Sequence, residues 1–301
     1  MRKNSKNFLK KWYPWNIIIL VLLILLIIVL IWGGVTQWRF VPESQKNEEY
    51  YKKSDLLVWG WAINPDRKKM EKGAEKFLNT AKKFNLNTEL IGIGYTYERH
   101  LAQDRFYVLR DFLKKVRSDQ IIVVMDSFDT LINGTSKEIL RKFKKFNTKI
   151  LFSAEKGWTW QYEHERHNFE SEKSPYKYIA AGTYMGYAKD LQKMNDDCIE
   201  LLENPKAYTK ADLKTAAEMG IMGIWVGKYI KDKSKVRLDT NCEIFWVTTH
   251  DDDLFEKQLK NEKITNPNTK TIPLMYHIVG ATREKDVIKL YQNIYDKVMN
   301  S

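Results

Sequence analysis

The sequence predicts an α/β fold preceded by one membrane-spanning helix, and three observations support this prediction. From residue 55 onward, short apolar runs alternate with amphipathic stretches, which is typical of an α/β sheet with its helices. A run of 19 residues without a charge, Ile17 to Val35, precedes this part. Hydrophobic residues make up 44% of the 301 residues and charged residues 29%, which favours a globular core and excludes a disordered or collagen-like chain.

The apolar run Ile17–Val35 is long enough to cross a membrane, because at about 1.5 Å per residue it spans the roughly 30 Å hydrocarbon layer. It exceeds the apolar region of a cleaved signal peptide and no A-x-A site follows it, so we interpret it as a signal anchor. Residues 1–16 hold five cations and no acid, and the positive-inside rule places this basic tail in the cytoplasm.

These features predict a single-pass type II membrane protein that has the lipid bilayer as a partner. Residues 36–54 are polar and lack apolar periodicity, so we expect a stem there, with the globular part at 55–301. The globular part would be luminal, in the endoplasmic reticulum or Golgi, if the source is eukaryotic or viral, and extracytoplasmic otherwise.

The globular part begins with a repeating order of strands and helices. The apolar residues of its helical stretches recur at three- and four-residue spacing, and its strands are short apolar runs. In chain order we expect strand Leu56–Ala62, helix Asp66–Phe84, strand Glu89–Gly94, helix Arg105–Val116, strand Ile121–Met125, helix Ser136–Phe146 and strand Ile150–Ala154. Ile121–Met125 is a continuous apolar run, as in a strand buried on both faces, so we place it centrally in the sheet.

The second half of the globular part has weaker signals. An apolar segment with glycines is followed by alternating helical and extended stretches. The expected elements are the segment Tyr178–Ala188, helices near Leu191–Leu202 and Ala211–Ile230, strands near Ile244–Thr248 and Ile272–Ile278, and a final helix from Arg283.

The charge of the chain favours a small anionic ligand over nucleic acid. The formal net charge is +12, but the tail holds five of the 50 cations, which leaves 45 − 38 = +7 for the remainder. Acids are well mixed with these cations, so the sequence shows no nucleic-acid-binding stripe. Cys198 and Cys242 are too few for a disulfide framework and form either one bridge or two free thiols.

Two aspartates follow the expected central strand. Ligands of open α/β sheets gather at the carboxyl ends of strands, where Asp126 and Asp129 form a D-x-x-D pair. One or two carboxylates can hold a hard divalent cation whose remaining positions take phosphate oxygens. Alternatively, Asp126 caps a turn and Asp129 is solvated. A haloacid-dehalogenase phosphatase is disfavoured, because Ser127 occupies the position of its nucleophilic aspartate. A second acidic segment, His250–Asp253, is interpreted as a solvated turn rather than a ligating one.

Six blocks of residues follow one another in an informative order. They are Leu56–Val58, Ile121–Asp129, Leu151–Glu155 with Trp158, Gly182 with Gly186–Ala188, Leu238–Asp239 with Ile244–Phe245, and Pro273 with His277 and Gly280. Together they resemble the glycosyltransferase domain of the procollagen lysyl hydroxylases and its stand-alone relatives. The resemblance implies a GT-A fold, with a mixed, mostly parallel sheet and flanking helices, for a glycosyltransferase domain at residues 55–301.

The resemblance also implies a metal site and a nucleotide-sugar site. Asp126, Asp129 and His277 would bind Mn²⁺ or Mg²⁺, which would bridge the diphosphate of a UDP-sugar. The remaining matched positions would bind the donor: Phe128, Glu155, Trp158 and Gly280. Phe128 replaces the family's usual tyrosine, so ring stacking is retained and a phenolic hydrogen bond is lost. The function implied is transfer of a sugar from a UDP-sugar to a protein or glycan acceptor.

Two departures concern the sugar pocket. Ala180–Thr183 stands where the family has N-S-G-G, and the apolar run Met219–Trp225 stands where the family has the aspartate-rich D-D-Q-L-F. Glu218 lies directly before this run and is therefore our candidate catalytic residue. Alternatively, the run is a buried apolar helix, and the chain is a catalytically inactive nucleotide-sugar- or glycan-binding protein on the same fold.

Overall fold

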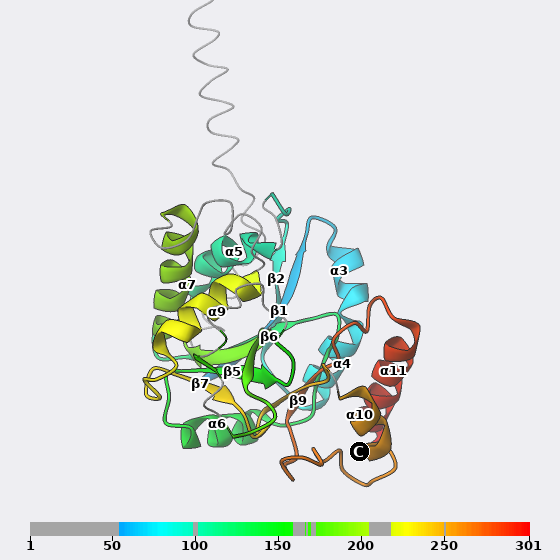
Figure 1. Ribbon diagram of the computed structural model, residues 1–301. Helices are drawn as coiled ribbons and strands as arrows, with labels where there is room; N and C mark the ends of the chain where they lie inside the picture. The colour runs from blue at the N-terminus through cyan, green and yellow to red at the C-terminus, as the bar shows by residue number, and fades with distance from the viewer. Residues whose placement is uncertain are drawn as a thin grey trace, which may run out of the picture. The chain divides into compact units, whose positions relative to one another are not determined.

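A mixed sheet of six strands forms the centre of the protein (Figure 1). Its strands are β1 (Leu56–Asn64), β2 (Thr88–Ile93), β3 (Ile121–Asp126), β5 (Ile150–Glu155), β6 (Tyr178–Tyr187) and β7 (Val236–Asp239). The spatial order is β2-β1-β3-β6-β5-β7. β1 is parallel to β2 and β3, and β5 is parallel to β7, whereas β6 is antiparallel to both of its neighbours. The sheet is therefore mixed and mostly parallel, which fits the expected GT-A fold.

This computed structural model describes residues 54–98, 102–158, 166, 168–169, 173–204, 218–249 and 251–301. Within these ranges no helix has both the length and the apolar character needed to cross a membrane. The predicted tail, the predicted anchor Ile17–Val35 and residues 36–53 of the predicted stem lie outside the described residues.

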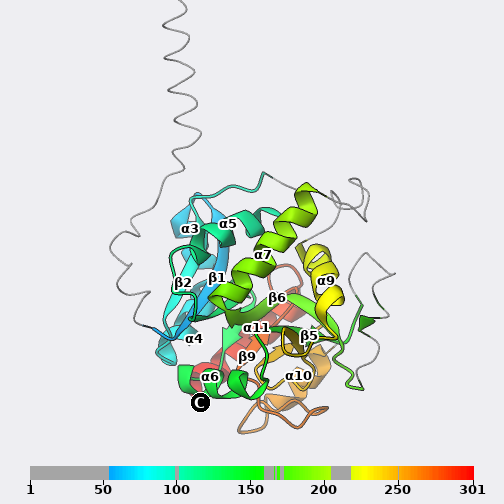
Figure 2. The same cartoon turned by 90° about the vertical axis from the view of Figure 1, so that its left-hand side faces the viewer.

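Helices cover both faces of the sheet. They are α3 (Arg67–Gly73), α4 (Glu75–Lys83), α5 (Asp104–Leu113), α6 (Ser136–Lys145), α7 (Ala188–Glu203), α9 (Glu218–Tyr229), α10 (Asp252–Gln258) and α11 (Lys285–Asn300). α5, α7 and α9 pack together on one face, which is turned toward the viewer in Figure 2. α4 and α6 pack on the other face, and α11 packs against α4.

The central strand β3 is buried on both faces, as its continuous apolar run predicted. Ile122 and Val124 belong to the core that includes α5 and α7. Ile121, Val123 and Met125 belong to the core that includes α4 and α6. This alternation follows from the two-residue period of a strand and explains why every residue of the run is apolar.

A second sheet of three short strands lies beside the end of β3. Its strands β4 (Thr130–Ile132), β9 (Met275–His277) and β8 (Phe245–Val247) are ordered β4-β9-β8. β4 is antiparallel to β9, with Thr130 opposite His277. The sequence did not predict β4, and the strand expected at Ile272–Ile278 is limited to Met275–His277. This small sheet joins two segments that are far apart in the sequence.

Three details differ from the sequence predictions or decide between them. The expected helix Asp66–Phe84 is divided between α3 and α4 at Ala74, beside the close approach of Gly73 to the ring of Phe128. Asp251 is buried rather than solvated, because it accepts hydrogen bonds from Tyr176 and Trp246 and pairs with a lysine. The two cysteines are buried free thiols, which excludes a bridge between them.

Candidate metal centre

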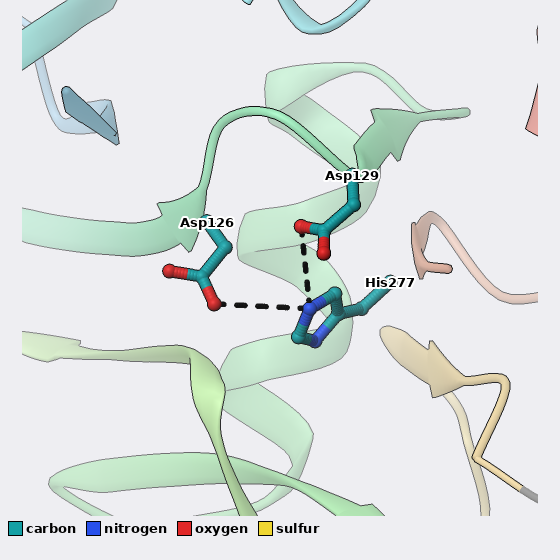
Figure 3. A group of neighbouring side chains, drawn as sticks. All are labelled: Asp126, Asp129 and His277. Carbon is teal, nitrogen blue, oxygen red and sulfur yellow. Dashed lines mark ion pairs between the residues drawn. The ribbon is translucent and has the colours of Figure 1, made fainter. Parts of the chain in front are cut away.

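Three side chains from different elements converge at the carboxyl end of β3 (Figure 3). Asp126 ends β3, Asp129 precedes β4, and His277 ends β9. One potential ligand atom from each lies within 4.8 Å of the others. His277 Nε2 is 3.4 Å from Asp129 Oδ1 and 3.8 Å from Asp126 Oδ2. The structure thus brings together the three residues for which the sequence predicted metal binding.

Hydrogen bonds fix the turn that carries the two aspartates. Ser127 donates its hydroxyl to the carbonyl oxygen of Trp61, and Thr130 donates its hydroxyl to the carbonyl oxygen of Asp126. The backbone N–H of Ile278 donates to the carbonyl oxygen of Asp129 at 2.8 Å. These three hydrogen bonds hold the backbone at both ends of the turn.

Gly182 gives the two segments room to approach each other. It lies in β6 beside the end of β3, where Thr183 pairs with Met125. A Cβ at Gly182 would lie 2.3 Å from His277 Cε1 and 2.8 Å from Asp126 Oδ2. No side chain fits at such distances, so the absence of one at Gly182 permits the convergence of Asp126 and His277.

Arg105, which the sequence analysis did not single out, connects Asp126 to Glu218. Its Nη2 is 2.7 Å from Asp126 Oδ1 and its Nη1 is 2.8 Å from Glu218 Oε2. Its guanidinium also lies 5.1 Å from the ring of Trp61. The available signal was weak: Arg105 is a cation in the first turn of a helix, where the dipole favours acids.

Glu218, the candidate catalytic residue, is buried at the start of α9 and pairs with Arg105. Burial raises the pKa of Glu218 to about 7, although the charge of Arg105 opposes this shift. The run that follows is a buried apolar helix: residues 220–227 are all buried. The run is thus a buried apolar helix, as one of the two interpretations expected, and α9 places no acid other than Glu218 beside Asp126.

The residues fit a divalent cation on chemical grounds. Two carboxylates and an imidazole suit a borderline ion such as Mn²⁺. Asp129 Oδ1 is buried, and no donor among the described residues reaches it with hydrogen-bond geometry. Burial alone would lower the pKa of His277, but the carboxylates of Asp129 and Asp126 outweigh burial and raise it. Arg105 already compensates one oxygen of Asp126, and a bound cation would satisfy the buried Oδ1 of Asp129.

The four predicted donor-binding residues have different surroundings. Phe128 packs against the small cluster formed by Ala62, Met70 and Ile93. Glu155 is the buried last residue of β5 and contributes to the raised pKa of His277. Trp158 and Gly280 complete the set. The ring of Trp158 is 5.3 Å from that of Tyr178, and Gly280 adopts a φ of +90° in the turn after β9. Donor binding by these residues remains a prediction.

Comparison with known proteins settles the family. Residues 63–301 match the family model described as the PLOD GT domain. The chain belongs to this family. One relative is the mouse procollagen-lysine,2-oxoglutarate 5-dioxygenase 2, to which the chain is 23% identical over 229 residues. This match covers 70% of this chain and 28% of the mouse protein. The chain is 24% identical over 224 residues to the multifunctional procollagen lysine hydroxylase and glycosyltransferase of Caenorhabditis elegans, covering 70% and 29%.

The chain thus spans less than a third of the length of these PLOD GT relatives. Two solved structures are also similar, at 11% identity each. One is a glycosyltransferase involved in the glycosylation of the major capsid of PBCV-1, with a TM-score of 0.46 over 79% of this chain and 98% of that chain. The other is an active-site mutant of LgtC, with a TM-score of 0.47 over 80% and 95%.

Proposed function

We propose that this PLOD GT-family chain is a membrane-anchored, metal-dependent glycosyltransferase that moves a sugar from a UDP-sugar to a protein or glycan acceptor. The observation that carries the proposal is the convergence of Asp126, Asp129 and His277 within 4.8 Å, in a chain of this family. The predicted anchor Ile17–Val35 supports the membrane location, with the domain on the luminal or extracytoplasmic side.

The metal chemistry would serve the leaving group. When bound, Mn²⁺ or Mg²⁺ supplies a Lewis acid that neutralises the charge developing on the diphosphate as the glycosidic bond breaks. The protein's part is positional. Arg105 engages Oδ1 of Asp126, which leaves Oδ2 directed toward His277, and Gly182 leaves this space open. Phe128 and Trp158 offer rings against which uridine or a sugar can stack.

A catalytically inactive sugar- or nucleotide-binding protein is the second candidate. The observation that favours it is α9, whose buried apolar residues occupy the place of the family's aspartate-rich run. Glu218 is the one acid there, and its carboxylate already pairs with Arg105. An inactive protein would keep the metal and nucleotide affinity but would not release UDP.

The two functions are separated by measuring UDP release by the full-length chain from a panel of UDP-sugars, with Mn²⁺ or with EDTA. The matched variants are Asp129→Ala, which removes a proposed ligand, and Asp119→Ala, which removes an exposed carboxylate beyond the other end of β3. We expect Mn²⁺-stimulated UDP release that is lost in Asp129→Ala and kept in Asp119→Ala. Binding of UDP and Mn²⁺ without release for any donor would favour the inactive protein, and metal-independent release would contradict the site.

A further inference from the structure

A basic surface lies on α6, away from the metal centre. A cavity of about 370 Å³ lies beside α6. It is lined by Arg141 and Lys145 of α6, by the C-cap residue Phe146, and by Arg237 of β7. Lys142 and Glu243 complete the lining. A neighbouring cavity of about 460 Å³ shares Arg141 and Lys142. We refer to Arg141, Lys145, Phe146 and Arg237 as the α6 basic surface.

Three cations of this surface form no ion pair among the described residues, although the charge of Arg141 helps to lower the pKa of Glu138, one helical turn away. Lys142 neutralises Glu243, since its Nζ lies 3.3 Å from a carboxylate oxygen of Glu243 and donates to two backbone carbonyls. No ion pair between described residues engages Arg141, Lys145 or Arg237; the Nε of Arg237 donates to a backbone carbonyl. Three cations thus line one concave space in which the only acid is already paired.

The structure of α6 explains only part of this charge. Cations in the last turn of a helix interact favourably with its dipole, which accounts for Lys145. Arg141 lies four residues earlier on the same helix face, where two like charges repel each other. Arg237 belongs to the edge strand β7 and gains nothing from the dipole. An anion between the three cations would relieve their repulsion.

The α6 basic surface is separate from the metal centre. From Arg237 the sheet leads across to Leu151 of β5 and then to Met185 of β6, which pairs with Val123 of β3. Asp126 lies three residues beyond Val123 along β3. Three residues along the strands and three strands across the sheet correspond to roughly 17 Å, at about 3.3 Å per residue and about 4.8 Å per strand. One sugar unit at the metal centre cannot reach this surface.

We propose that the α6 basic surface binds a sugar chain that carries anionic groups, namely carboxylates, sulfates or phosphates. The cations select the anionic groups, and the cavity with the partly buried ring of Phe146 at its wall suits a sugar ring. A nucleic acid is disfavoured because Phe146 is the one aromatic residue lining the two cavities, whereas stacking platforms use several. The choice of a sugar as the carrier of the charge rests on the proposed function.

The test measures binding of a galacturonate hexamer by isothermal titration to the full-length chain. EDTA is present throughout, so that the metal centre does not contribute and loss of glycosyltransfer activity cannot affect the result. The matched ligand is the same hexamer with methyl-esterified carboxylates. The test variant is Arg141→Ala/Lys145→Ala, and its matched control is Lys68→Ala/Lys72→Ala. Each removes two cations spaced four residues apart on a helix, and the control removes them from the exposed face of α3.

We expect the original protein to bind the charged hexamer saturably and the esterified hexamer at least ten-fold more weakly. Arg141→Ala/Lys145→Ala should bind the charged hexamer at least ten-fold more weakly than the original protein, and Lys68→Ala/Lys72→Ala should bind it within two-fold of the original protein. Unchanged thermal unfolding and Mn²⁺ affinity would show that the α6 variant is folded. Equal losses in both double variants would mean diffuse charge attraction and overturn the site, as would no saturable binding. Binding of inorganic pyrophosphate but not of the hexamer would overturn the sugar-chain assignment.

Discussion

The substitution Gly182→Ala should disrupt the metal centre although it changes none of the proposed ligands. The added Cβ would lie 2.3 Å from His277 Cε1, and ordinary contact begins at 3.4 Å, so the ring must retreat by 3.4 − 2.3 = 1.1 Å. Metal sites tolerate changes of about 0.2 Å in their ligand distances. We therefore expect the affinity for Mn²⁺ to fall at least as much as on loss of an outer-shell partner, about 10 to 100-fold.

Gly182→Ala should lower the stability of the folded state less than it lowers the affinity for Mn²⁺. Overpacking in a buried site costs about 1–3 kcal/mol, and part of this is relieved when the ring of His277 moves. The variant Gly182→Ala/His277→Ala tests this directly, because without the imidazole the main clash is absent. The loss of stability from Gly182→Ala should thus be smaller in the His277→Ala background, measured as the free energy of unfolding in urea.

The assay is titration of the full-length chain with Mn²⁺ in the absence of donor, with Gly134→Ala as the matched control. At Gly134 the same methyl group would meet the end of the Leu274 side chain at 2.8 Å, outside the metal centre. This control should lower stability without changing Mn²⁺ affinity. If Gly182→Ala binds Mn²⁺ within two-fold of the original protein, then Asp126 and His277 do not share an ion, and their convergence does not form a metal site.

Three further predictions concern the buried network and the predicted membrane anchor. Arg105→Met leaves the carboxylates of Asp126 and Glu218 without their cation, so the free energy of unfolding in urea should fall by about 3–5 kcal/mol. Arg105→Met/Glu218→Gln should restore part of this loss, whereas no restoration would mean that Arg105 only fills space. The pKa of Glu218 is raised from 4.5 to about 7, so the folded state binds the proton of Glu218 more tightly than the unfolded state does, and the resulting stabilisation is present below pH 4.5 and lost as the pH rises to about 7. Glu218→Gln should therefore flatten the plot of unfolding free energy against pH between 4.5 and 7, and parallel plots for the two proteins would refute the raised pKa. Protease added to sealed vesicles of cytoplasm-inside orientation should digest the domain that follows Ile17–Val35, whereas full protection would reverse the predicted topology.

The sequence predicted the sheet where local pattern determines structure. The alternation of β1, β2, β3 and β5 with helices was readable because buried strands are short apolar runs and their helices have one apolar face. The direction of β6 was not readable, since a strand has the same two-residue period whether it runs parallel or antiparallel. β4 was missed because three residues, Thr130–Ile132, are too few to show a period.

Some residues of the candidate site could be predicted from local sequence, and others only from the resemblance to a family or from the structure. Asp126 and Asp129 follow an apolar run, so a carboxylate pair at a strand end could be expected from the sequence alone. His277 is 277 − 129 = 148 residues beyond Asp129. No periodicity reports contact over that distance, and only the resemblance to a family predicted its role. Arg105 was not predicted as part of the site, and Gly182 was expected only in the sugar-pocket segment Ala180–Thr183. Their importance for the metal centre depends on which side chains α5 and β6 bring beside them.

The pairing of β4 with β9 has a consequence for the order in which the protein acquires its parts. The turn with Asp126 and Asp129 leaves the ribosome long before β9. The hydroxyl of Thr130 holds its Asp126 end locally, whereas the carbonyl oxygen of Asp129 gains its hydrogen bond from Ile278 only after β9 has been made. The third ligand arrives only after nearly 150 further residues have been synthesised and β9 has found β4, and such long-range pairing is slow. A nascent chain would therefore hold a metal ion weakly until this step, and tight metal capture would mark the completion of the domain.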